Sequence, residues 1–146
     1  MNQVFISAEE VHMPAWSTDA GNFAKSVMEE LGLEKWILSM LFCSNRYIKS
    51  LNSQYRTKDE ATDVLSFSLG ETDPDGNYLA GDIVISIEAL EENSRFFKVD
   101  ADEELRRLIV HGILHLSGKD HVTNKAGESM LEIQEGILLR LKEKAL

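Results

Sequence analysis

The sequence contains a single cysteine, Cys43, and its longest hydrophobic run is only WILSMLFC at 36–43. A lone cysteine has no partner for an internal disulfide, which predicts a reducing, cytoplasmic setting. The run is far shorter than the roughly 20 apolar residues that a membrane-spanning helix requires. The first residues, MNQVFISAEEVHM, lack the basic start and apolar stretch of a signal peptide, so we expect no secretory leader.

Basic residues are also in short supply, with 15 Lys and Arg against 25 Asp and Glu and a net charge of −10. This charge argues against non-specific binding of nucleic acids over the whole surface, although a local basic cleft is compatible with it. Internal repeats, low-complexity tracts and linkers are absent from the sequence. A chain of 146 residues suits one domain, spanning 1–146.

Hydrophobic periodicity predicts an α+β fold, with about four strands in one mixed sheet and about five helices. The expected strands lie at 4–6, 36–43, 64–69 and 80–86, and the expected helices at 17–31, 44–55, 87–97, 100–118 and 124–141. We expect Ser17 or Thr18 to cap the first helix and Ser44 to cap the second. Asp100 and Glu103 have the spacing of a capping box.

Three of the four histidines lie in the segment HGILHLSGKDH at 111–121. His111 and His115 are four residues apart on a predicted helix, so their side chains share one face. Gly118 suits the end of that helix, after which His121 can return as a third ligand. Three neutral imidazoles leave one position of a zinc ion open, which is the catalytic pattern. We therefore predict one Zn²⁺ per chain, with another divalent metal as the alternative.

The spacing matches the zinc-protease signature H-E-x-x-H-x-x-G-x-x-H, except that Gly112 replaces the glutamate that acts as general base. Glycine inside a helix costs about 1 kcal/mol relative to alanine. Gly112 therefore indicates close packing of another element against the helix, space beside the metal for a bulky substrate, or both. Asp120, next to the last histidine, either orients a ligand or moves protons, or is an ordinary loop residue.

A charged segment, LNSQYRTKDEATDVLSF at 51–67, joins a helix to a strand. Arg56 falls at the helix end, where the helix dipole favours a cation. Alternatively, its planar guanidinium projects into a cleft and holds an anion. Since the whole chain is acidic, binding of a nucleic acid would need a local basic patch, for which the candidates are Arg46, Lys49, Arg56, Arg106, Arg107 and Lys119.

The segments LNSQYRTKDEATDVLSF, GDIVIS and HGILHLSGKDH, in this order and spacing, resemble the YbeY family of bacterial endoribonucleases. The resemblance covers the chain from about residue 45 to its end. It implies a cytoplasmic, metal-dependent endoribonuclease that is specific for single strands. It also implies maturation of the 3′ end of 16S ribosomal RNA and ribosome quality control. The expected partners are single-stranded and ribosomal RNA and the small ribosomal subunit or its proteins, without membrane or DNA.

By this resemblance the metal ligands are His111, His115 and His121, and the catalytic arginine is Arg56. Two positions depart from the family pattern: Ala61 stands where proline is frequent, and Lys119 stands where an aromatic residue is common. Neither touches the ligands, but Lys119 alters local contacts to the substrate. Two alternatives remain: a metal-dependent peptidase or amidase, against which the missing glutamate counts, and a non-catalytic zinc module that docks on ribosomes.

Overall fold

The computed structural model describes residues 1–56, 63–118, 124–144 and 146. For residues 55, 56 and 124–130 it describes the backbone only. Within the described residues the strands are β1 (Gln3–Glu9), β2 (Trp36–Cys43), β3 (Val64–Thr72) and β4 (Tyr78–Ser86). The helices are α1 (Ser17–Glu30), α2 (Asn45–Arg56), α3 (Ile87–Phe97), α4 (Ala101–Leu116) and α5 (Asn124–Arg140). The predicted α+β fold is confirmed. In this part of the chain, no helix is both long and apolar enough to cross a bilayer.

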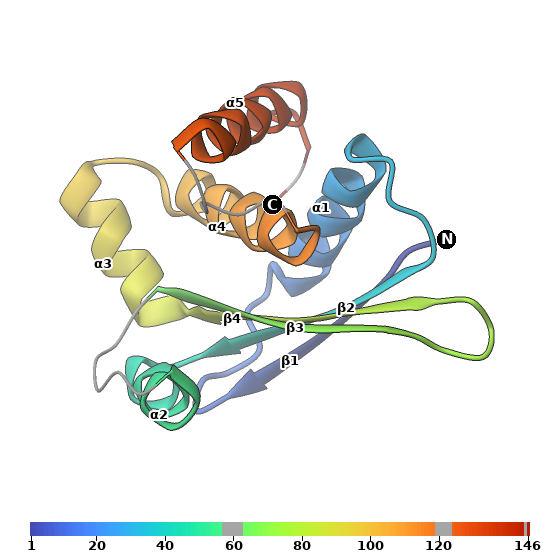
Figure 1. Cartoon of the computed structure of the whole chain (residues 1–146). Helices are drawn as coiled ribbons and strands as arrows, with labels where there is room; N and C mark the ends of the chain where they lie inside the picture. Colours follow the sequence, from blue (N-terminus) through green and yellow to red (C-terminus); the bar gives the residue numbers. More distant parts are fainter. Residues whose placement is uncertain (57–62, 119–123, 145) are drawn as a thin grey trace.

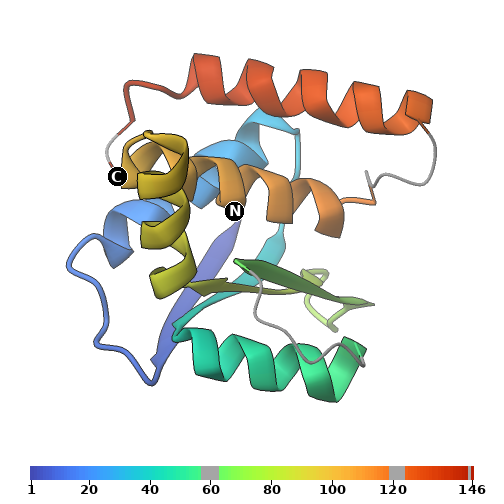
Figure 2. The same ribbon diagram turned by 90° about the vertical axis from the view of Figure 1, so that its left-hand side faces the viewer.

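The four strands form one mixed sheet in the order β1-β2-β4-β3. β1, β2 and β4 run parallel, while β3 is antiparallel to β4 and forms an edge of the sheet. Helices α1 and α4 cover one face of the sheet and α2 packs on the other (Figure 1). α5 lies on the outer side of α4 and runs in the opposite direction (Figure 2). α4 is thus held between α5 and the sheet.

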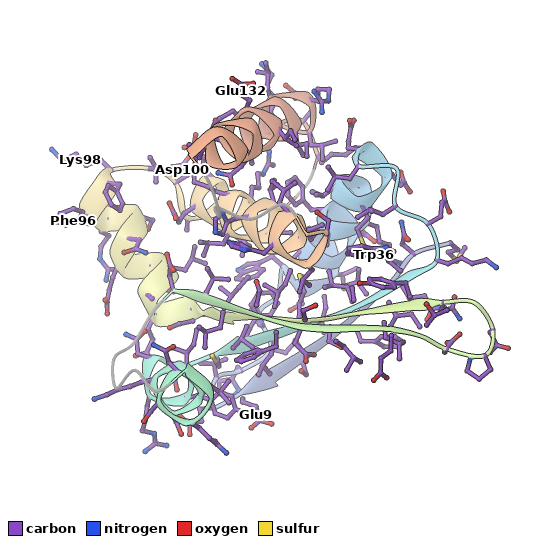
Figure 3. All side chains as sticks on the ribbon, in the orientation of Figure 1. Glu9, Trp36, Phe96, Lys98, Asp100 and Glu132 are labelled. Carbon is purple, nitrogen blue, oxygen red and sulfur yellow. The ribbon has the colours of Figure 1, made fainter. Side chains whose placement is uncertain are left out.

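Successive side chains of β2 point to opposite faces of the sheet, and apolar residues stand at both sets of positions. Both faces of the sheet are therefore covered. One set of the β2 side chains is buried against α1 and α4: Trp36, Leu38, Met40 and Phe42. On the opposite face, Cys43 packs in a smaller cluster with Ile48 of α2 and Val84 of β4. Full burial of each large apolar side chain contributes about 1.5–3 kcal/mol, so the larger cluster dominates the stability. Figure 3 shows the layer between the sheet and its covering helices filled with side chains.

α4 packs closely on the sheet at Gly112. A β-carbon on this residue would lie 2.8 Å from Cδ1 and 3.0 Å from Cγ1 of Ile83 on β4. Ile83 is itself fully buried. Close packing therefore explains the glycine, and the volume beside it is occupied by a core side chain. The second interpretation, that Gly112 leaves room beside the metal for a substrate, stays a prediction.

Two of the predicted helix ends are confirmed. The hydroxyl oxygen of Ser44 accepts a hydrogen bond of 3.1 Å from the backbone N–H of Tyr47 and so caps α2. Gly118 has φ +88°, a conformation that favours glycine. Its N–H donates to the carbonyl oxygen of His115 at 3.0 Å, which ends α4 as predicted.

Two predicted caps do not form. The N-cap of α1 is Trp16, without a side-chain hydrogen bond, so the expected cap at Ser17 or Thr18 is wrong. The Ser17 hydroxyl instead donates to the carbonyl oxygen of Pro14 in the preceding turn. Asp100 is the N-cap of α4, but its side chain makes no capping hydrogen bond. Acidic side chains in the first turn already complement the dipole of this helix.

Candidate functional site

A cleft of about 260 Å³ lies between the C-terminal half of α4 and the edge strand β3. Its lining combines apolar, hydroxyl and imidazole groups: Val64, Leu65, Ser66, Ser68, His111, His115 and Leu116. Ser66 and Ser68 are two residues apart on β3, so both side chains leave the strand on the same side. The cleft therefore offers two hydroxyl groups opposite two imidazole rings.

The helical spacing of His111 and His115 brings their rings together, as predicted. The ring centroids are 4.5 Å apart at an interplanar angle of 75°, and the two Nε2 atoms are 3.0 Å apart. A tetrahedral zinc ion with Zn–N bonds of about 2.0–2.1 Å separates two ligand nitrogens by about 3.3 Å. Small side-chain adjustments therefore suffice for the pair to hold one ion.

The side chains of the other predicted site residues lie outside the described part of the chain. Arg56 is the last residue of α2, and its side chain lies outside the described part of the chain. His121 and Asp120 also lie outside the described residues. Among the side chains that the structure describes, no three potential ligands come together in one metal site. The three-histidine site and the roles of Arg56 and Asp120 therefore stay predictions.

A further polar residue, Gln134 of α5, reaches the histidine pair. Its side chain is only 5% exposed, and its Oε1 atom lies 3.3 Å from Nδ1 of His111. Hydrophobic periodicity does not predict this residue, because it uses only the apolar positions of the helix. A polar residue at helical spacing within the apolar face was the available signal.

Among the described residues that line the cleft there is no lysine or arginine, so the predicted basic patch is not seen there. Arg46 pairs with Glu10, with 3.1 Å between Nη2 and Oε2. Arg106 donates to backbone carbonyl groups that follow α5, so it serves the C-terminal turn. Arg107 lies one turn before the histidine pair on α4 and bonds Glu135. That ion pair is solvent-exposed and contributes about 0–1 kcal/mol, so Arg107 can exchange Glu135 for a phosphate at small cost.

Two carboxylates, of Asp63 and Glu104, lie outside the cleft lining, before the start of β3 and near the start of α4. Asp63, just before β3, accepts a hydrogen bond of 3.1 Å from the amide of Asn93 on α3. Burial raises the pKa of the Glu104 carboxyl, and the negative charge of Asp63 raises it further. A phosphate backbone is disfavoured beside these carboxylates. We therefore expect it to approach from the C-terminal end of α4, where the histidines lie.

Comparisons with known proteins define the class to which this fold and cleft belong. The model of the family Endoribonuclease YbeY matches residues 3–142. The chain is 49% identical to Endoribonuclease YbeY of Treponema denticola over 125 residues, which are 83% of this chain and 81% of that protein. It is 45% identical to Endoribonuclease YbeY of Borrelia turicatae over 133 residues, or 90% of this chain and 89% of that protein.

A solved structure agrees with these matches. The solution structure of a Thermotoga maritima protein is similar with a TM-score of 0.64 and 28% sequence identity. The similarity covers 95% of this chain and 91% of the Thermotoga chain. The class is thus that of the endoribonucleases. The chain belongs to the YbeY family, which confirms the resemblance carried by its three motifs.

Proposed function

We propose that this chain is a metal-dependent endoribonuclease that cleaves single-stranded RNA, with one zinc ion held by His111, His115 and His121. The observation that supports it most strongly is the 3.0 Å approach of two imidazole Nε2 atoms in the cleft of a YbeY-family chain. We further propose that the substrate is ribosomal RNA at the 3′ end of 16S RNA, met on the small ribosomal subunit in the cytoplasm. Ribosome quality control belongs to the same proposal.

In this proposal the histidines of the cleft bind the metal, and its serines, together with Arg56, contact the phosphate. His111 and His115 would hold the ion as neutral imidazoles. When bound, the metal stabilises negative charge on a phosphoryl oxygen and lowers the pKa of a water molecule. The hydroxyl groups of Ser66 and Ser68 line the same cleft and can donate hydrogen bonds to phosphate oxygens. Arg56 would supply a planar, two-pronged donor to the phosphate.

The packing of α4 counts against peptide hydrolysis. In zinc peptidases of this signature, the general base is a glutamate directly after the first histidine. Here that position is Gly112, and even a β-carbon there would overlap Ile83. A glutamate side chain at this position cannot reach the metal without displacing the core. Position 112 therefore does not supply the base of such a peptidase, and the described lining of the cleft offers groups suited to a phosphodiester.

The test uses the purified full chain and one RNA oligonucleotide labelled at its end. We expect cleavage of the single strand, little cleavage of the duplex, and none of a single-stranded DNA of the same sequence. A chelator should abolish cleavage while the circular dichroism spectrum persists, and added Zn²⁺ should restore it. Undiminished cleavage in the metal-free protein would refute the metal role. Binding to small ribosomal subunits without cleavage of any RNA would favour the non-catalytic module.

A further inference from the structure

The buried amide of Gln134 requires a hydrogen-bonding partner. Gln134 shares the inner face of α5 with Ile137 and Leu141, which belong to the main hydrophobic core. Burying an amide without a compensating hydrogen bond costs about 1–3 kcal/mol in proteins. The contact of its Oε1 with Nδ1 of His111, at 3.3 Å, supplies such a partner. A polar residue is thus placed in an otherwise apolar face directly behind one imidazole of the cleft.

The atom that faces the ring bears on which nitrogen of His111 carries the proton, because here it is the amide oxygen of Gln134 that lies 3.3 Å from Nδ1. An amide oxygen only accepts hydrogen bonds, so Nδ1 of His111 must be the donor. In a neutral imidazole, a proton on Nδ1 leaves Nε2 with its lone pair exposed. That Nε2 atom is the one that lies 3.0 Å from Nε2 of His115, where a shared ion would bind. The histidine is therefore held in the tautomer that metal binding at Nε2 requires.

We propose that Gln134 is a positioning residue for His111, which sets its tautomer and ring orientation for metal binding. The inference rests on the proposed function, because it assumes that His111 is a metal ligand. α5 is anchored on the core by residues on the same face as Gln134, so the amide oxygen is held in a fixed place. Removing such a partner from a metal-bound histidine typically weakens metal binding tenfold to a hundredfold.

The first test measures zinc affinity in the full chain, by competition with a chromophoric chelator. Gln134→Met keeps the length and the apolar packing of the side chain but removes the acceptor oxygen. We expect zinc binding to weaken by about tenfold to a hundredfold. Gln134→Glu keeps the acceptor and strengthens it with charge, so it should bind zinc at least as tightly as the wild type. The matched control is Glu135→Gln, which alters the next residue and its exposed pair with Arg107, and should leave zinc affinity unchanged.

The second test reads the tautomer directly, from the nitrogen chemical shifts of His111 in the metal-free protein. In the wild type and in Gln134→Glu, the proton should reside on Nδ1, and in Gln134→Met it should move in part to Nε2. A role confined to packing would change the free energy of unfolding in urea and leave both readouts unaltered. Wild-type zinc affinity in Gln134→Met, or a proton on Nε2 of His111 in the wild type, would overturn the inference.

The two proposals fail in different ways. A wild-type chain that binds no zinc refutes the metal-dependent function, and the metal role of Gln134 with it. A wild-type chain that binds zinc, with an equally tight Gln134→Met variant, refutes only the positioning role. If Gln134→Met does not fold, the tautomer of the wild type and the zinc affinity of Gln134→Glu still decide the matter.

Discussion

Replacing Gly112 by alanine tests how closely α4 is seated on the sheet. The added methyl group would lie 2.8 Å from Cδ1 of Ile83, in a region without solvent exposure. Overpacking of this kind costs about 1–3 kcal/mol. Alanine is favoured over glycine inside a helix by about 1 kcal/mol. We therefore expect Gly112→Ala to lower the free energy of unfolding by about 1 kcal/mol, as the difference between these effects.

The same substitution should have the opposite sign when Ile83 is truncated. Ile83→Ala removes Cδ1, Cγ1 and Cγ2, which are the three atoms nearest to the added methyl group. Alone it should cost about 2–5 kcal/mol, because it leaves a cavity in the core. In this background Gly112→Ala meets no clash and keeps its helix-propensity gain, so it should stabilise by about 1 kcal/mol. The coupling energy of the pair is then about 2 kcal/mol.

The assay is urea unfolding of the four proteins of this cycle, followed by circular dichroism with a chelator present. The chelator keeps metal binding from adding to the measured stability. Equal destabilisation by Gly112→Ala in both backgrounds would show that the strain does not arise at Ile83. Stabilisation in both backgrounds would show that α4 and β4 are farther apart than described. Either result refutes the close-packing explanation of this glycine.

Further outcomes follow from the site and the core. His115→Ala should lose most of the bound zinc in elemental analysis, and full occupancy would contradict its assignment as a ligand. Arg56→Lys should lose much of the ribonuclease activity with little change in metal content or Tm, whereas full activity would favour a simple helix-end role. Gly112→Glu should unfold or be strongly destabilised in urea, because its carboxylate would be forced into the core beside Ile83; wild-type stability would contradict this. Burial raises the pKa of the Cys43 thiol to about 12, so an alkylating reagent at pH 8 should modify it only after unfolding. Since the unfolded thiol ionises first, with a pKa near 9.0, the stability that this group contributes should be present at lower pH and decline from about pH 9 upward.

Local patterns in the sequence predicted the elements well. The apolar run at 36–43 is β2, and Ser44 directly after it caps α2. β3 extends beyond the predicted residue 69 to Thr72, because the carboxylate of Asp73 accepts two backbone N–H groups of the following turn and prolongs the hairpin. The position of β4 between β2 and β3 was not predictable, since strand order depends on contacts between segments far apart in the chain.

In the candidate site, too, local spacing predicts some features, while others depend on contacts between distant segments. The pairing of His111 with His115 follows from a four-residue helical spacing, so sequence alone predicts it. The contact of Gln134 with His111 depends on how α5 crosses α4, which no local pattern specifies. The reason for Gly112 likewise lies on β4, in a side chain that only the folded structure brings near. The hydrogen bond from Arg106 to the carbonyl oxygen of Lys142 also joins segments far apart in the chain, so no local pattern predicts it.

The close contact between Gly112 and Ile83 also limits how this helix can change its chemistry during evolution. A nuclease of this kind and a zinc peptidase differ in signature by one residue after the first histidine. Here a single exchange to glutamate passes through an unstable protein, because the new side chain collides with the core. Ile83 on β4 would first have to be replaced by a smaller residue, which lowers the stability, before glutamate could be placed at position 112. In this chain the order of the two substitutions therefore matters, because glutamate at position 112 fits only after the side chain at position 83 has become smaller.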